Sequence, residues 1–244
     1  MGFVRQVAAL VFIIALPVAL VTTTIRIAAN EPRLYSYAAD HYDTPETTGI
    51  ERSELLRASG ELRDYFNNGD DAVFIRVRKD GDLISLFNPR ETAHLRDVKS
   101  LFQASFRVQE GTVVFVLAYV VGMFIWAREG TLRGLAKQLL ISSALGVVVI
   151  GLLGVIVATG FDAAFERFHL IFFTNDLWQL DPDRDRLIQM FPEGFWQDVT
   201  LWVGLATLAE LGLLALGSLA YLGLSRRAAL TYTLPATAQP QAQH

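Results

Sequence analysis

No cysteine occurs among the 244 residues. This absence excludes a disulfide framework, a thiolate zinc site, an iron–sulfur cluster and a cysteine nucleophile. Charged residues are also scarce, at 19%, where soluble domains carry about 25%. The net charge of -4 argues against a nucleic-acid partner, and the sequence lacks the glycine-rich phosphate loops of nucleotide-binding proteins. With 52% hydrophobic residues, the composition indicates a membrane protein rather than a cytosolic enzyme.

Four stretches are long and apolar enough to span a bilayer, which takes about 20 residues. They cover residues 6–25, 111–127, 138–161 and 199–225. Backbone polar groups need internal partners in hydrocarbon, so each stretch is predicted to be a helix. We expect the first to kink at Pro17 and to remain as an anchor, because it is longer than the apolar part of a signal peptide. Glu210, within the fourth, is expected to be paired or neutral.

Basic residues gather at one end of these spans. Arg5 precedes the first span, three basic residues lie between the second and third, and two follow the fourth: Arg128, Arg133 and Lys137, then Arg226 and Arg227. Glu129 is the single acid beside them. Because lysine and arginine favour cytoplasmic flanks, both termini and the short loop are predicted to face the cytoplasm. Segments 28–110 and 162–197 then lie together outside.

The predicted fold is mainly α: a polytopic membrane protein with four transmembrane helices and a small α+β extracytoplasmic domain containing a β-hairpin. In chain order, we expect a first transmembrane helix (1–27), the extracytoplasmic domain (28–110), a second transmembrane helix (111–127), a cytoplasmic loop (128–137), a third transmembrane helix (138–161), an extracytoplasmic interfacial segment (162–197), a fourth transmembrane helix (198–225) and a disordered cytoplasmic tail (226–244).

The sequence of the extracytoplasmic domain predicts the order of its helices and strands. Thr44-Pro45-Glu46 favours a helix start, and residues 51–66 carry apolar side chains at helical spacing. Residues 72–77 have the alternating pattern of a strand, residues 79–82 favour a turn, and residues 83–87 are predicted to form the returning strand. This order is typical of a hairpin. Such a hairpin is marginal alone, so we expect it to pack on another surface.

A new helix is predicted to begin at Asn88-Pro89-Arg90-Glu91, where asparagine suits the N-cap, proline the first position and glutamate the third. We expect this helix to run to about residue 109, before the second span. At 100° per residue, His94 shares a face with Glu91 and Asp97.

The segment 162–197 is rich in aromatic residues. Phe161, Phe165, Phe168 and Phe172 recur at helical spacing, so an aromatic face is predicted to continue out of the third span. His169 lies one turn after Glu166. Asp181-Pro182 indicates a short helix running through Met190. A further set of aromatic residues is expected to mark the membrane interface: Trp178, Phe191, Phe195, Trp196 and Trp202.

His94 and His169 allow three interpretations. A nearby carboxylate orients an imidazole and raises its basicity, which suits acid–base catalysis. Each histidine can instead be an ordinary partly buried residue with a hydrogen-bond partner. The two Glu-x-x-His pairs, Glu91 with His94 and Glu166 with His169, also match part of a di-iron carboxylate site, although the further glutamates of that site are lacking. We therefore expect no metal at these residues.

Three stretches carry a family resemblance: residues 89–99 (PRETAHLRDVK), 168–182 (FHLIFFTNDLWQLDP) and 187–196 (LIQMFPEGFW). Together with the four spans they resemble the bacterial lipoprotein intramolecular transacylase family (Lit), an integral membrane family. The resemblance covers about residues 1–225.

This resemblance implies a membrane acyltransferase of the bacterial cytoplasmic membrane, with its active site at the outer face. The implied reaction moves an acyl chain from the sn-2 ester of a lipoprotein's diacylglyceryl cysteine to the cysteine α-amine. The partners are then a diacylated lipoprotein and membrane lipid, and no cofactor is needed because the ester already holds the acyl group. Two alternatives stay open: a non-catalytic membrane protein that binds a lipid or protein partner, and a Glu-x-x-His metal-dependent membrane enzyme.

The same resemblance implies that His94 and His169 are the functional histidines. Our hypothesis is that His94 acts as base, oriented by Asp97 or Glu91. His169 then serves as acid or oxyanion donor and is supported by Glu166. The sequence does not separate the two roles, which can be exchanged. Further candidates for positioning are Arg90, Asn175 and Asp176.

Overall fold

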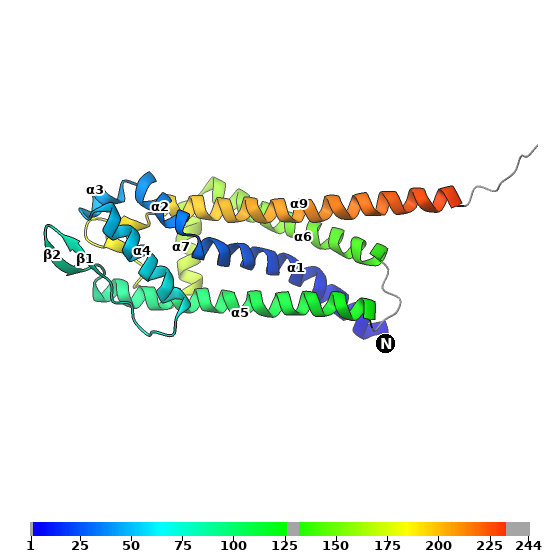
Figure 1. Ribbon diagram of the computed structural model, residues 1–244, viewed down its shortest axis with the longest axis horizontal. Helices are drawn as coiled ribbons and strands as arrows, with labels where there is room; N and C mark the ends of the chain where they lie inside the picture. Colours follow the sequence, from blue (N-terminus) through cyan, green and yellow to red (C-terminus); the bar gives the residue numbers. More distant parts are fainter. Residues whose placement is uncertain (1, 126–131, 233–244) are drawn as a thin grey trace, which may run out of the picture.

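The computed structural model describes residues 2–125 and 132–232. Four long helices lie side by side along the molecule (Figure 1): α1 (Gly2–Asn30), α5 (Pro89–Ile125), α6 (Leu132–Thr159) and α9 (Glu193–Tyr232). Each is long and apolar enough to cross a membrane. The four predicted spans are confirmed as helical: residues 6–25 lie in α1, 111–125 in α5, 138–159 in α6 and 199–225 in α9.

Helix α1 occupies the middle of the bundle and packs against α5, α6 and α9. Pro17 has no N–H, so it leaves the carbonyl of Ile13, four residues earlier, without its helical partner. Ser142 of α6 donates its hydroxyl hydrogen to that carbonyl at 2.8 Å. Close approach there also needs Gly146, because a Cβ at this position would lie 2.7 Å from Leu211 and 3.1 Å from Pro17. The bundle thus accommodates the proline as expected.

The remaining elements gather at one end of the bundle (Figure 1): α2 (Pro32–His41), α3 (Thr44–Thr48), α4 (Arg52–Asn67), β1 (Arg76–Lys79), β2 (Asp82–Ser85), α7 (Phe161–Phe172) and α8 (Arg186–Met190). Segments that are far apart in the sequence share one apolar core there. Leu55, Leu62 and Val77 from the first segment pack in the same cluster as Met190 and Phe195 from the second. The two segments predicted to lie together form one domain.

The hairpin is antiparallel, with Arg76 opposite Ser85 and Lys79 opposite Asp82. Its two turn residues, Asp80 and Gly81, have φ of 53° and 90°, as a two-residue turn that matches strand twist requires. The paired strands are shorter than residues 72–77 and 83–87. The expected alternation nevertheless extends beyond them, since Val73, Ile75 and Val77 are buried while the residues between are exposed. The hairpin packs on α4.

Several helix boundaries differ from the sequence prediction. Helix α5 is uninterrupted, so the expected end near residue 109 is wrong, and one helix carries both the capped first turn and the second predicted span. Helix α6 ends at Thr159, and after Gly160, with ψ of 73°, α7 runs across the bundle (Figure 1). The aromatic face therefore belongs to a separate crosswise helix rather than to a continuation of the third span.

Two further helix boundaries differ from the prediction. Helix α8 begins at Arg186 after the N-cap Asp185, and Asp181 instead accepts from the backbone of Asp183 in the preceding turn. Helix α9 reaches Tyr232, so residues 226–232 of the predicted disordered tail are helical. Arg128, Glu129 and residues 233–244, including the rest of that tail, lie outside the described residues. Helix α2 was not predicted.

Phe191 and Phe195 were expected at the membrane interface, but both are buried in the core of the domain at the end of the bundle. Trp196 packs against that core, and Trp202 contacts Tyr37 edge-on at 4.7 Å. The residues of the second segment that expose large apolar side chains are instead on α7: Phe168, Leu170, Ile171 and Phe172.

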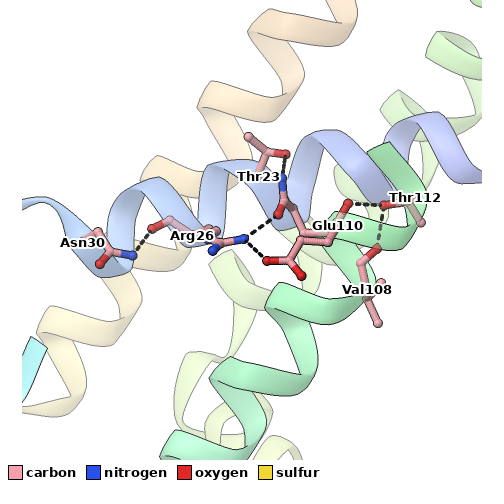
Figure 2. A network of polar contacts seen from close by, with 7 residues as sticks. Thr23, Arg26, Asn30, Val108, Glu110 and Thr112 are labelled. Atoms are coloured by element: carbon pink, nitrogen blue, oxygen red, sulfur yellow. Dashed lines mark hydrogen bonds and ion pairs between the residues drawn. The ribbon is translucent and has the colours of Figure 1, made fainter. Parts of the chain in front are cut away.

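Polar contacts fix α1 against α5 and α9. The Arg26 guanidinium of α1 donates to Glu110 at 2.7 Å and to Gln109 at 2.9 Å (Figure 2). It also lies 4.8 Å from the centre of the Phe106 ring, a cation–π distance. Glu210 of α9 accepts from the Thr24 hydroxyl at 3.4 Å, so the predicted partner for this intramembrane acid is present.

Candidate active site

His94 of α5 and His169 of α7 meet where the crosswise helix reaches α5. Their ring centroids are 6.1 Å apart with an interplanar angle of 35°. Both side chains are buried, with exposed fractions of 5% and 7%. The structure therefore brings together the two histidines that the sequence analysis singled out, from helices far apart in the chain.

Aromatic rings surround the pair on several sides. Trp178 stacks on His169 with centroids 4.8 Å apart and planes at 26°. Phe165, one turn before His169 on α7, lies edge-on to it at 4.4 Å. Phe173 contacts both imidazoles, at 5.2 Å from His94 and 5.5 Å from His169. The imidazoles thus lie in an apolar setting with little freedom of ring orientation.

The two imidazoles have different hydrogen-bond environments. Nδ1 of His169 lies 2.7 Å from the Phe165 carbonyl oxygen. A carbonyl only accepts, so this nitrogen carries the hydrogen and Nε2 has the free lone pair. Nδ1 of His94 is buried without a hydrogen-bond partner among the described residues. A buried acceptor tolerates this better than a buried N–H, which favours the tautomer of His94 with hydrogen on Nε2.

Burial keeps both histidines neutral near pH 7. For His94, burial and the nearby His169 lower the pKa to about 4, against a smaller opposing effect of Asp97. Burial also lowers the pKa of His169, and the hydrogen bond to Phe165 works in the opposite direction. A neutral imidazole accepts or donates a proton according to its tautomer, as acid–base chemistry requires.

The carboxylate of Glu91 binds backbone N–H groups around the site rather than the imidazole of His94. Its carboxylate accepts from the N–H of Asn88 at 2.7 Å, while the Asn88 side chain accepts from the N–H of Glu91 at 3.0 Å. This is the predicted capping box. The other carboxylate oxygen accepts from the N–H of Leu187 at 2.6 Å, in the first turn of α8. The expectation that Glu91 orients the His94 ring is therefore wrong.

Two links hold the connection after α7 against α5. Asn175 donates to the Asp97 carboxylate at 2.9 Å. Arg90 donates to the Asp176 carbonyl at 2.5 Å. The connection carries Trp178 onto His169, so these residues position the site indirectly. Asp97 acts on His94 through its charge, and its carboxylate accepts the hydrogen bond from Asn175.

Glu166 does not make the expected supporting contact with the His169 imidazole. Its side chain is exposed on α7, and within residues 2–125 and 132–232 the hydrogen bond of the His169 ring is to Phe165. Sequence analysis also missed Trp178, which it assigned to the membrane interface. The aromatic ring lies nine residues after His169, and its contact depends on how the intervening connection folds back.

The described residues contain no group of three or more histidine and acidic side chains arranged to hold a metal ion. The carboxylate oxygens of Glu91 are already occupied by backbone N–H groups. The metal interpretation of the two Glu-x-x-His pairs therefore lacks its ligand set in this part of the chain.

Comparison with known proteins agrees with this architecture. The sequence model of lipoprotein intramolecular transacylase Lit matches residues 10–196. An uncharacterized protein of Aquifex aeolicus (strain VF5) is 27% identical over 205 residues, which cover 82% of this chain and 88% of that protein.

The fold is similar to that of the membrane integral lipoprotein intramolecular transacylase Lit from Bacillus cereus. The TM-score is 0.77 at 21% identity, covering 93% of this chain and 100% of the other. A variant of that protein with a histidine replaced by alanine gives a TM-score of 0.73 at 21% identity, covering 93% and 97% of the two chains. Because the family model matches more than half of the sequence, the chain belongs to the lipoprotein intramolecular transacylase Lit family and is a membrane acyltransferase.

Proposed function

We propose that this protein moves an acyl chain within a diacylated lipoprotein, from the sn-2 ester of the diacylglyceryl group to the α-amine of the N-terminal cysteine. The observation that carries the proposal is the buried pair of His94 and His169, 6.1 Å apart between ring centroids. Family membership supplies the reaction class, and this pair supplies the groups that the reaction needs.

The hydrogen-bond environments favour distinct roles. His169, with hydrogen on Nδ1, offers the Nε2 lone pair and acts as the base. His94, with hydrogen on Nε2, donates to the oxygen that becomes negative in the tetrahedral intermediate. This assignment exchanges the roles of the initial hypothesis, which the sequence left open. It follows from the bond between His169 and the Phe165 carbonyl and from the unpaired His94 Nδ1.

The proposed step balances without any co-reactant. The neutral amine attacks the ester carbonyl carbon, a C–N bond forms, and Nε2 of His169 takes a proton from the amine. The bond between the carbonyl carbon and the sn-2 oxygen then breaks, and that oxygen receives the proton. The products are an N-acyl amide and a free glycerol hydroxyl. Because donor and acceptor belong to one molecule, proximity contributes much of the rate.

The surroundings suit a substrate with long acyl chains. Helix α7 exposes Leu170, Ile171 and Phe172, and such a surface is stable against lipid. We infer that the domain and the site lie at the outer face of the bacterial cytoplasmic membrane. In this orientation both termini face the cytoplasm, in accord with Arg5, Arg133 and Arg226.

The experiment that tests the proposal locates the acyl chain by tandem mass spectrometry. The purified protein in lipid vesicles is incubated with a synthetic diacylated lipopeptide. Intramolecular transfer leaves the intact mass unchanged, so fragment ions must report an N-acyl cysteine with a lyso-glyceryl group. His94→Ala and His169→Ala are expected to lower product formation by about 100-fold or more.

His41→Ala is the matched control, because His41 is an exposed histidine at the end of α2. We expect it to keep wild-type turnover. Unaltered lipopeptide with the folded wild-type protein would show that this substrate is wrong. Product formation at normal rates in both site variants would instead show that the two-histidine mechanism is wrong.

A further inference from the structure

A polar hollow of about 460 Å³ lies at the start of α5, the helix that carries His94. One wall is the start of α5, with Asn88 and Arg90, and the other is the turn before α8, with Gln179, Leu180, Asp181, Arg184 and Asp185. Gln179 directly follows Trp178, the residue stacked on His169. The hollow and the histidine pair are therefore neighbours along the same connection.

Along α5, Arg90 precedes His94 by four residues, which is one helical turn. Both side chains consequently lie on similar faces of the helix, about 6 Å apart along its axis. Arg90 is on the side of His94 away from the membrane-spanning part of α5. A substrate with its acyl chains in the bilayer and its reacting groups at the histidines must direct its peptide to this side.

The acceptors in the hollow are occupied. Asp185 accepts from the Asn88 side chain at 2.8 Å and from the N–H of Asp181 at 2.7 Å. Asp181 in turn accepts from the N–H of Asp183 and from Arg184. These carboxylates are thus committed to holding the turn.

The Arg90 guanidinium, in contrast, is an open donor. It is exposed, and among the described residues its Nη2 donates to the Asp176 carbonyl. A guanidinium has five N–H donors in a planar fork that matches a carboxylate. Arg184, the other guanidinium of the hollow, is paired with Asp181. A ligand in this hollow is therefore favoured if it brings acceptors to Arg90 and disfavoured if it brings another cation.

We propose that this hollow binds the peptide that follows the acylated cysteine, and that Arg90 selects an acidic residue at the second position after it. The inference rests on the proposed function and specifies its substrate. An extended chain advances about 3.4 Å per residue, so two residues cover the axial distance from His94 to Arg90. Lysine at the same position would face the guanidinium and is disfavoured.

The test uses three synthetic diacylated lipopeptides that differ only at the second residue after the cysteine, which is glutamate, glutamine or lysine. The full-length protein in vesicles of zwitterionic lipid is assayed for kcat/KM on each. We expect the glutamate peptide to exceed the lysine peptide by about tenfold, as a partly exposed charge-assisted contact allows. Arg90→Gln should remove most of this ratio, and Arg90→Glu should invert it.

The ratio between peptides separates charge recognition from loop support. Loss of the Arg90 link to Asp176 would lower turnover of all three peptides together and leave their ratio unchanged. Arg33→Gln removes one positive charge from an exposed side chain on α2 and should keep the wild-type ratio. Equal kcat/KM for the three peptides in the wild type would overturn the assignment of the hollow while leaving transacylation intact. Absence of transfer from every peptide would overturn both proposals.

Discussion

Ser142 donates its hydroxyl hydrogen to the carbonyl oxygen of Ile13, the group that Pro17 leaves unpaired in the centre of the bundle. The neighbouring hydroxyl of Ser143 is equally buried but has no hydrogen-bond partner among the described residues. The two adjacent serines of α6 are therefore equally buried, but of the two only Ser142 makes a hydrogen bond with its hydroxyl among the described residues.

Ser142→Ala is expected to destabilise the protein by about 1 kcal/mol, because it leaves a buried carbonyl without a partner. Ser143→Ala removes a hydroxyl that is already unsatisfied, so it should be neutral or slightly stabilising. Thermal unfolding of both variants in the same detergent measures the difference. A loss as large in Ser143→Ala as in Ser142→Ala would contradict this explanation.

Stability should depend on pH through His94. Its pKa is lowered to about 4 in the folded protein, whereas an unfolded histidine has a pKa of about 6.5. Between these values the unfolded chain binds more protons, so stability is greatest above pH 6.5 and falls as the pH decreases toward 4. The expected loss is about 3 kcal/mol. His94→Gln cannot take up this proton and should flatten that part of the unfolding profile; an unchanged profile would contradict the prediction.

The link between Asn175 and Asp97 should matter more than the charge of Asp97. Asn175→Ala removes the donor and frees the connection that carries Trp178, so we expect kcat to fall about tenfold. Asp97→Asn keeps an oxygen acceptor for Asn175 and should lose less than about threefold. Steady-state kinetics on one lipopeptide compare the two variants. A greater loss in Asp97→Asn would assign the main role to the carboxylate charge.

Trp178 should act on kcat rather than on KM, because it contacts the His169 imidazole and does not line the polar hollow. Trp178→Ala is expected to lower kcat by about tenfold, and Trp178→Phe should restore part of it by keeping an aromatic face. Trp202→Ala, which removes a tryptophan from α9 beside Tyr37, is the control. A loss confined to KM in Trp178→Ala would be the contrary result.

Local patterns in the sequence predicted the parts of the site that depend on neighbouring residues. The capping box of Asn88 and Glu91 has both reciprocal bonds. The turn at Asp80 and Gly81 has the backbone that its residues favour. Helical spacing placed His94 on the same face of α5 as Glu91, and both side chains are buried there. Each of these follows from interactions within a few residues, for which spacing is informative.

Other features depend on contacts between distant segments and were not predicted. Glu91 has the right spacing to reach His94, but the N–H of Leu187 competes for its carboxylate. The residues around Trp178 have the composition of a membrane-interface segment. Only the fold of the connection after α7 brings the indole ring onto His169. The direction of α7 depends on the backbone of Gly160, and glycine permits many conformations without indicating one. Spacing alone carries no information about these choices.

The unbroken course of α5 couples the position of His94 to the tilt of the helix in the bilayer. From Glu110 to His94 the helix extends about 24 Å without a joint. A tilt of about 5° around Glu110 therefore displaces His94 by about 2 Å. Because α7 is a separate helix joined at Gly160, His169 does not follow that movement rigidly. A change in bilayer thickness, which alters the tilt of spanning helices, is therefore expected to change the distance between the two imidazoles.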